Sequence, residues 1–237
     1  MEIKILFNND ALNNRFKTGW GFSCLVNETV LFDTGACPDA LLHNMKLMKI
    51  NCREIKTIVI SHEHWDHIDG LWGFLTKNND VTVYVCSGFS KEFKDRIKSY
   101  GTNIVEAGKT TMIKDAVFVT GEIQCLYKGL PMPEQALIIL NEAGVNIITG
   151  CSHPGIINII ELVKKKYFVL PINLVVGGFH LKDTDKKSIE SVIEKFKELG
   201  VKKVWPTHCS GDLAVRLFAE NGYFDREEIK VGQIVKI

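Results

Sequence analysis

The sequence lacks three features, and each absence narrows what the protein can be. It has no excess of charge of one sign, because 29 basic residues nearly balance 28 acidic ones and the formal net charge is +1. Binding to nucleic acid or to an anionic membrane generally needs a basic excess, so we expect neither partner. No apolar run approaches the roughly 20 residues that span a bilayer. The segment from Met1 to Phe7 is typical of a short strand rather than a signal peptide, so we expect a soluble, cytoplasmic protein.

The seven cysteines include no CxxC pair, and their number is odd. A secreted disulfide framework favours an even set in a shorter chain. Free thiols in a reducing compartment fit this pattern better, and most would serve as small buried apolar groups. Cys151 and Cys209 differ from the rest, because each lies close to a histidine in a Gly- or Ser-containing loop.

No linker, low-complexity tract or short repeat divides the chain, so we interpret residues 1–237 as a single domain. Short runs rich in β-branched residues alternate with amphipathic patterns of helical period, which is typical of an α/β fold. The predicted strands are Ile3–Phe7, Phe22–Val26, Val30–Phe32, Thr57–Ile60, Val81–Val85, Ala116–Thr120, Ala136–Leu140, Val145–Thr149, Leu174–Val176 and Lys202–Trp205. The predicted helices are Ala40–Lys49, Phe89–Tyr100, Ile156–Lys166, Ser188–Leu199 and Leu213–Asn221.

Three histidines fall within six residues, in the run His62-Glu63-His64-Trp65-Asp66-His67 that follows the predicted strand Thr57–Ile60. Imidazole and carboxylate groups are the donors that borderline divalent metals prefer. Alternate residues of an extended segment point the same way, so we expect His62 and His64 to share one ion. Asp66 and His67 would then address a second ion, with a helix beginning near Ile68.

Three further histidines each follow a predicted strand, at the edge where α/β proteins gather their ligand sites. His153 lies in Gly-Cys-Ser-His-Pro-Gly, His180 in Gly-Gly-Phe-His-Leu, and His208 in Pro-Thr-His-Cys-Ser-Gly. Together with the first cluster they predict a two-metal site. His43 lies inside a helical pattern without such flanks, and we interpret it as structural or exposed.

The HxHxDH run, the upstream Leu-Phe-Asp-Thr-Gly of residues 31–35 and the later loop histidines resemble the metallo-β-lactamase superfamily. The segments around His153, His180 and His208 resemble more narrowly its branch of dihydropterin ribofuranosylaminobenzene-phosphate synthase-like proteins. The resemblance spans almost the whole chain. It implies a four-layer αβ/βα sandwich, the metallo-β-lactamase fold, with a binuclear metal site at one edge of the two sheets.

The resemblance also implies a role for each candidate residue. One ion would take His62, His64 and His153, and the other would take Asp66, His67 and His208. Asp33 would orient a ligand or the motif loop. Many members carry a bridging aspartate where this chain has Cys151, so the bridge is either Cys151 or water alone. His180 has no counterpart among the general ligands, and we favour a substrate-contacting or acid/base role for it.

These observations predict a metal-dependent hydrolase, or a hydrolase-like transferase, in which a water activated by two metal ions attacks a small metabolite that bears phosphate or carboxylate. The branch suggests a pterin-related substrate. Asp66 would accept a proton while ligating, and His180 would donate one to the leaving group. Zinc suits the nitrogen-rich donor set best, with iron or manganese as alternatives. A second hypothesis is a non-catalytic, metal- or redox-responsive binding protein that uses the same pocket. The sequence does not specify an oligomeric state.

Overall fold

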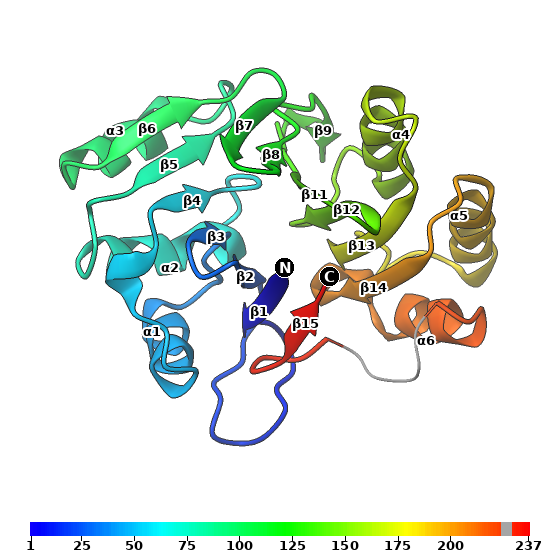
Figure 1. Cartoon of the computed structure of the whole chain (residues 1–237), viewed down its shortest axis with the longest axis horizontal. Helices are drawn as coiled ribbons and strands as arrows, with labels where there is room; N and C mark the ends of the chain where they lie inside the picture. Colours follow the sequence, from blue (N-terminus) through cyan, green and yellow to red (C-terminus); the bar gives the residue numbers. More distant parts are fainter. Residues whose placement is uncertain (224–228) are drawn as a thin grey trace.

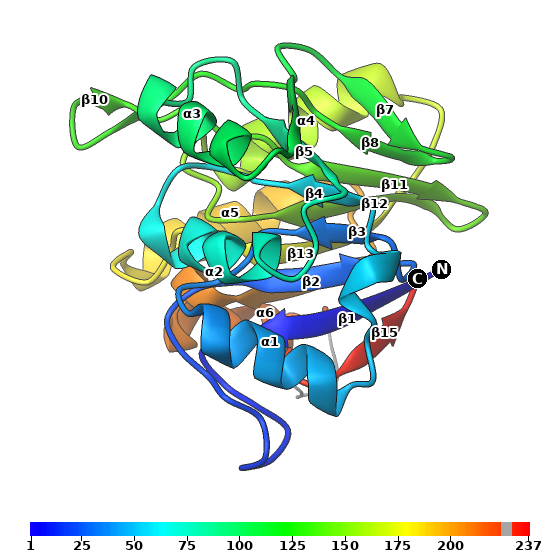
Figure 2. The ribbon, with the colours of Figure 1, turned by 90° about the vertical axis from the view of Figure 1, so that its left-hand side faces the viewer.

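Two β-sheets packed face to face form the centre of the protein, and helices cover their outer faces (Figure 1). The computed structural model describes residues 1–223 and 229–237. The strand order of the first sheet is β15-β1-β2-β3-β4-β5-β6, and that of the second is β14-β13-β12-β11-β8-β7. Figure 2, turned by 90°, shows α1 and α2 lying over the face of the first sheet. The predicted four-layer αβ/βα sandwich is therefore confirmed.

The first sheet combines β1 (Glu2–Phe7), β2 (Ser23–Val26), β3 (Val30–Phe32), β4 (Thr57–Val59), β5 (Thr82–Val85), β6 (Asn103–Glu106) and β15 (Ile234–Lys236). β3 to β6 run parallel, whereas β15, β1, β2 and β3 pair antiparallel. Its helices are α1 (Pro38–Leu47), α2 (Trp65–Leu75) and α3 (Lys91–Ser99). A short 3-10 turn, Cys52–Glu54, precedes β4.

The second sheet combines β7 (Thr111–Lys114), β8 (Val117–Val119), β11 (Leu137–Asn141), β12 (Gly144–Thr149), β13 (Ile172–Gly178) and β14 (Lys203–Thr207). β12, β13 and β14 run parallel, and α4 (Ile156–Lys166) and α5 (Lys186–Glu198) connect them. α6 (Asp212–Glu220) completes this side. A separate hairpin of β9 (Leu126–Tyr127) and β10 (Leu130–Pro131) projects from the molecule in Figure 2.

Three apolar layers hold the sandwich together. One lies between the two sheets and includes Phe22, Phe32 and Ile148, all fully buried. The second lies under α1 to α3, and the third lies under α4 to α6, where Phe179, Phe196 and Phe218 pack against one another. Because the central parallel strands are buried on both faces, their sequences are continuous apolar runs without a polar alternation.

The strands and helices predicted from sequence agree with the structure to within two residues at each end. β11 and β12 form an antiparallel hairpin, with Asn141 paired to Gly144 across the turn. Asp185 caps α5 by accepting from the Ser188 N–H, and Gly200 follows its end with a positive φ of 72°. The prediction that a helix begins near Ile68 is wrong, since α2 begins at Trp65. None of the helices within residues 1–223 and 229–237 has the length and apolarity to cross a bilayer.

Candidate metal centre

The early start of α2 divides the HxHxDH run into two parts with different backbone conformations. His62 lies in the extended segment after β4, and His64 is the extended N-cap residue of α2. Asp66 and His67 belong to the first helical turn, where a carboxylate interacts favourably with the helix dipole. This division directs the two pairs of side chains into two separate groups.

The first group consists of His62, His64 and His153, whose candidate ligand atoms lie within 4.8 Å of one another. His62 Nε2 and His64 Nδ1 are 3.1 Å apart. Burial, followed by the neighbouring imidazoles, lowers the pKa of His62 well below its usual value and that of His64 to about 4. Both rings are therefore neutral near pH 7, which is the form that binds a metal ion.

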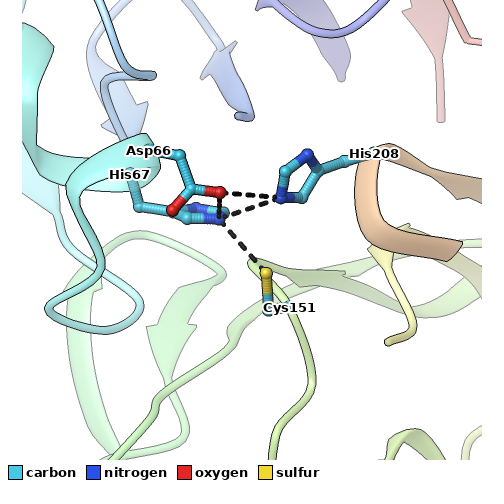
Figure 3. A group of neighbouring side chains, drawn as sticks. All are labelled: Asp66, His67, Cys151 and His208. Carbon is cyan, nitrogen blue, oxygen red and sulfur yellow. Dashed lines mark hydrogen bonds and ion pairs between the residues drawn. The ribbon is translucent and has the colours of Figure 1, made fainter. Parts of the chain in front are cut away.

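The second group consists of Asp66, His67, Cys151 and His208, all buried (Figure 3). His208 Nε2 lies 3.3 Å from His67 Nε2 and 3.2 Å from Asp66 Oδ2. The sulfur of Cys151 lies 3.3 Å from His67 Nε2 and also falls within 4.8 Å of candidate atoms of His153 and His180. Cys151 thus adjoins both groups, the position that a bridging ligand would occupy. Two imidazoles, a carboxylate and a thiol are donors that fit a borderline divalent metal such as zinc.

A hydrogen-bonded network behind the ligand groups fixes two of the rings. The buried Asp33 carboxylate accepts from His67 Nδ1 at 2.6 Å and from the Ser61 N–H and hydroxyl at 2.7 Å each. The Ser61 hydroxyl also lies 2.8 Å from His62 Nδ1. Asp33 is thereby bonded directly to the His67 ring and linked through Ser61 to the His62 ring. Gly150 packs against this network, where a Cβ would overlap the Ser61 side chain.

Charge within this network favours an ion pair between His67 and Asp33 in the absence of metal. Burial alone would lower the pKa of His67, but the adjoining Asp33 carboxylate raises it to about 9. Burial raises the pKa of Asp33, and the His67 ring opposes that shift. A metal ion at His67 Nε2 would replace the proton on that nitrogen, and Nδ1–H would still donate to Asp33.

Glu134 is the principal site residue that sequence reasoning missed. It is 1% exposed and accepts four hydrogen bonds, from the backbone N–H groups of Cys151, Ser152 and His153 and from His153 Nδ1 at 2.9 Å. Burial favours the neutral acid, but the hydrogen bonds from His153 outweigh it and lower the pKa of Glu134. The carboxylate therefore shapes the Cys151–His153 loop and leaves His153 Nε2 available as a ligand atom. Asn9 lies similarly close to His208, with Oδ1 3.3 Å from Nδ1.

His180 lies at the wall of a cavity of about 480 Å³ that opens above both groups. Its ring centroid is 4.7 Å from that of His153. A hydrogen bond with the Cys209 side chain raises the pKa of His180. Cys209 itself is buried and lies outside both ligand groups within the described residues. His43 on α1 also lies apart from the site, with Nε2 2.8 Å from the Arg15 carbonyl oxygen.

Four of the nine non-glycine residues with positive φ in residues 1–223 and 229–237 lie in these loops. Asp33, Ser152, His180 and His208 all have positive φ values, between 51° and 63°. Such values are uncommon for residues other than glycine and tend to gather at functional sites, where the surrounding structure enforces them. The segments after β3, β12, β13 and β14 thus each hold one such residue, and His180 and His208 line the cavity.

Comparisons with known proteins identify relatives of this chain. Residues 23–140 match the family model described as the metallo-beta-lactamase superfamily. A 7,8-dihydropterin-6-methyl-4-(beta-D-ribofuranosyl)-aminobenzene-5'-phosphate synthase from Methanocaldococcus jannaschii is 30% identical over 89% of this chain and 85% of its own length. An uncharacterised protein of the same organism is also 30% identical, over 94% of this chain and 95% of its own.

Among solved structures, Tm1679, described as a metal-dependent hydrolase of the beta-lactamase superfamily, superposes with a TM-score of 0.83. It is 30% identical, and the match covers 100% of this chain and 99% of that one. The sequence match, the shared fold and the two histidine-rich groups lead to one conclusion: the chain belongs to the metallo-β-lactamase superfamily.

Proposed function

We propose that this protein is a metal-dependent hydrolase, or a transferase with related chemistry, that acts on a small anionic metabolite. The observation that carries the proposal is the pair of adjoining ligand groups beneath one cavity: His62, His64 and His153 beside Asp66, His67, Cys151 and His208. Two divalent ions bound there would lower the pKa of a water molecule and polarise a carbonyl or phosphoryl oxygen.

The protein's own groups have distinct tasks in this proposal. His180 is exposed at the cavity wall, and its raised pKa keeps a larger fraction of the ring protonated near neutral pH, so it would supply a proton to the leaving group. Burial alone would raise the pKa of Asp66, but the hydrogen bond from His208 outweighs burial and the pKa of Asp66 is lowered. A lowered pKa favours the ionised carboxylate, which supports ligation more strongly than the predicted role as proton acceptor.

The substrate is proposed to be anionic because the side chains of Lys128 and Lys182 line the cavity. The synthase relative from M. jannaschii adds pterin-related compounds to the candidates. We propose zinc as the metal, with iron and manganese as the alternatives that elemental analysis would distinguish.

Elemental analysis of the purified, reconstituted protein tests the metal centre, alongside His64→Ala, His208→Ala and the remote control His43→Ala. We expect about two equivalents of metal in the wild type and in the control, and a loss in each of the other two variants. Loss confined to His64→Ala would indicate a mononuclear site. Absence of metal after reconstitution would contradict the proposal.

Turnover then separates an enzyme from a binding protein. The metal-loaded protein is assayed with phosphoesters, lactones and pterin phosphates before and after treatment with a chelator. Activity that disappears with the metal and returns on its restoration supports the hydrolase. Stoichiometric metal without turnover would favour the non-catalytic, metal- or redox-responsive alternative, in which Cys151 and Cys209 would be the responsive thiols. Activity that survives metal removal would contradict both.

A further inference from the structure

A third group of candidate metal ligands adjoins the two groups of the proposed centre. It consists of Cys151, His153 and His180, whose ligand atoms lie within 4.8 Å of one another. Cys151 is shared with the second group and His153 with the first, and His180 is the new member. We call these three residues the outer group, because the His180 side chain is exposed whereas His62 of the first group is fully buried.

The end of β13 is built so that His180 lies close to the other two residues. Gly178 packs against the segment after β12, where a Cβ would lie 2.3 Å from the Gly150 carbonyl oxygen. Phe179 is buried, and its backbone N–H donates to the Ser210 hydroxyl at 3.0 Å. These contacts enforce at His180 a φ of 55°, a value that residues other than glycine seldom adopt. The fold therefore fixes the position of His180 although its side chain is exposed.

The donor atoms of the outer group suit the same ions as the proposed centre. Glu134 accepts from His153 Nδ1, so Nε2 of that ring is the atom left for a metal ion. One thiolate and two imidazoles form a donor set that borderline ions such as Zn²⁺ and Co²⁺ favour. The sulfur distinguishes the outer group from the first group, whose three donors are all imidazoles.

The first group and the outer group cannot both bind an ion through His153 at once. Because Glu134 engages Nδ1, a single nitrogen of His153 is available to an ion. An ion can therefore lie in the first group or in the outer group, and His153 is a ligand in both positions. The outer group is accordingly an alternative position for the first ion rather than a place for a third ion.

The outer group lies on the route from solvent to the buried ligands. All three of its residues line the cavity of about 480 Å³, and so do Trp20 and Tyr127. The Tyr127 ring lies directly against the outer group, with its centroid 4.7 Å from that of His153 and 5.4 Å from that of His180. An ion that enters the cavity therefore meets the outer group before it reaches the buried ring of His62.

We propose that the outer group binds an incoming divalent ion first and passes it to His62 and His64. His153 stays bound throughout, while the other two imidazoles of the first group replace that of His180. Ligation by Cys151 releases its thiol proton to solvent. Once the ion lies in the first group, His180 is free for the proton donation described above. This inference rests on the proposed function, because it concerns the loading of the same metal centre.

Rapid mixing of the metal-free protein with Co²⁺ tests the inference, because absorbance reports both the rate of uptake and ligation by a thiolate. In the wild type we expect absorption from a Cys151–Co²⁺ bond to appear before that of the complete centre. His180→Asn removes the imidazole but supplies a residue type that tolerates the positive φ. Loss of a group that merely orients a ligand costs about 10- to 100-fold in metal affinity. Loss of a loading ligand should therefore slow uptake by about tenfold or more, while metal content at equilibrium stays at the wild-type value.

Matched variants separate ligation from the other effects of the substitution. His180→Asp restores an oxygen ligand on the same side-chain frame and should recover much of the rate. In about 1 M salt the attraction between exposed charges is largely screened, so a rate that His180→Asp recovers there reports ligation. His43→Asn replaces a histidine on α1 whose Nε2 lies 2.8 Å from the Arg15 carbonyl oxygen, and it should change neither the rate nor the metal content.

The outcomes distinguish this inference from the proposed function. Equal uptake rates in the wild type and His180→Asn, with two equivalents bound by each, would overturn the inference and leave the proposed function intact. Uptake that stays slow in His180→Asp would also overturn it, because the effect would then belong to the loop and not to the ligand. A lower equilibrium metal content in His180→Asn would make His180 a resident ligand and overturn its loading role. Two-stage uptake by a protein that turns over no substrate would support the inference and contradict the hydrolase.

Discussion

Replacement of Glu134 by glutamine should weaken metal binding while the fold is preserved. The two side chains have nearly the same volume, but the amide offers one acceptor oxygen where the carboxylate offers two. In the wild type, one Glu134 oxygen accepts from the Cys151 and Ser152 N–H groups, and the other accepts from the N–H and Nδ1 of His153. If the amide oxygen keeps the first pair, its NH₂ group faces His153 Nδ1. That contact favours the imidazole tautomer with the proton on Nε2, the atom needed for the metal.

The size of the effect follows from what the carboxylate does in the structure. Loss of the partner that orients a metal-binding histidine typically costs about 10- to 100-fold in metal affinity. Replacement by alanine should also destabilise the metal-free protein, because four buried donors lose a charged acceptor. Hydrogen bonds to charged groups contribute about 1.5–3 kcal/mol each, and the losses are not additive, so we expect about 3–5 kcal/mol.

Competition with a chromophoric chelator measures the affinity, and urea unfolding of the metal-free protein measures the stability. Glu122→Gln is the control, since Glu122 also accepts a backbone N–H, from Gly88, but lies outside both ligand groups. Wild-type metal affinity in Glu134→Gln would refute the argument. So would a loss of stability in Glu134→Ala no larger than that in Glu122→Ala.

Three further predictions concern the core, the network and the tight packing behind the site. Phe179→Ala removes a ring whose centroid lies 5.6 Å from that of Phe196 and 5.8 Å from that of Phe218. The free energy of unfolding, measured in urea, should therefore fall by about 3–5 kcal/mol. A fall below about 1 kcal/mol would contradict this packing. The pKa of His67 is raised from 6.5 to about 9, so protonation stabilises the metal-free fold below pH 6.5 and that contribution is lost as pH rises through about 9. Urea unfolding across this window should show the decline in the metal-free wild type, and Asp33→Asn should remove it; the same decline in both proteins would contradict the assignment. Gly150→Ala should lower both the metal content and the melting temperature, because the added methyl group overlaps the Ser61 side chain. An unchanged metal content would contradict this expectation and show that the loop adjusts without losing metal.

The sequence predicts the parts of this protein that are local or strongly periodic. The HxHxDH run is contiguous, and its histidines and aspartate are residue types that commonly bind metal ions. Buried parallel strands such as β13 give apolar runs that need no partner to be recognised. The strands β6, β7 and β15 were missed, because they are short and have partly exposed, polar residues typical of sheet edges. β9 and β10 were also missed, because each has only two residues.

Glu134, Trp20 and Tyr127 could not be assigned to the site for a different reason. Glu134 is separated from His153 by 19 residues and precedes an ordinary apolar strand. Trp20 and Tyr127 reach the cavity only because the loop between β1 and β2 and the β9–β10 hairpin lie at the same edge of the sandwich. An acidic residue shortly before an apolar strand is the one signal that the sequence alone offered, and it does not identify a partner.

The contribution of ligands by both sheets has a consequence for the order of events during folding. His62, His64, Asp66 and His67 are neighbours along the chain, whereas His67 and His208 are separated by 141 residues. The complete centre therefore exists only after the two halves of the sandwich have docked, and contacts of such long range form slowly. Metal uptake at full affinity would accordingly report the final docking of the halves, and bound metal would fasten them together against unfolding.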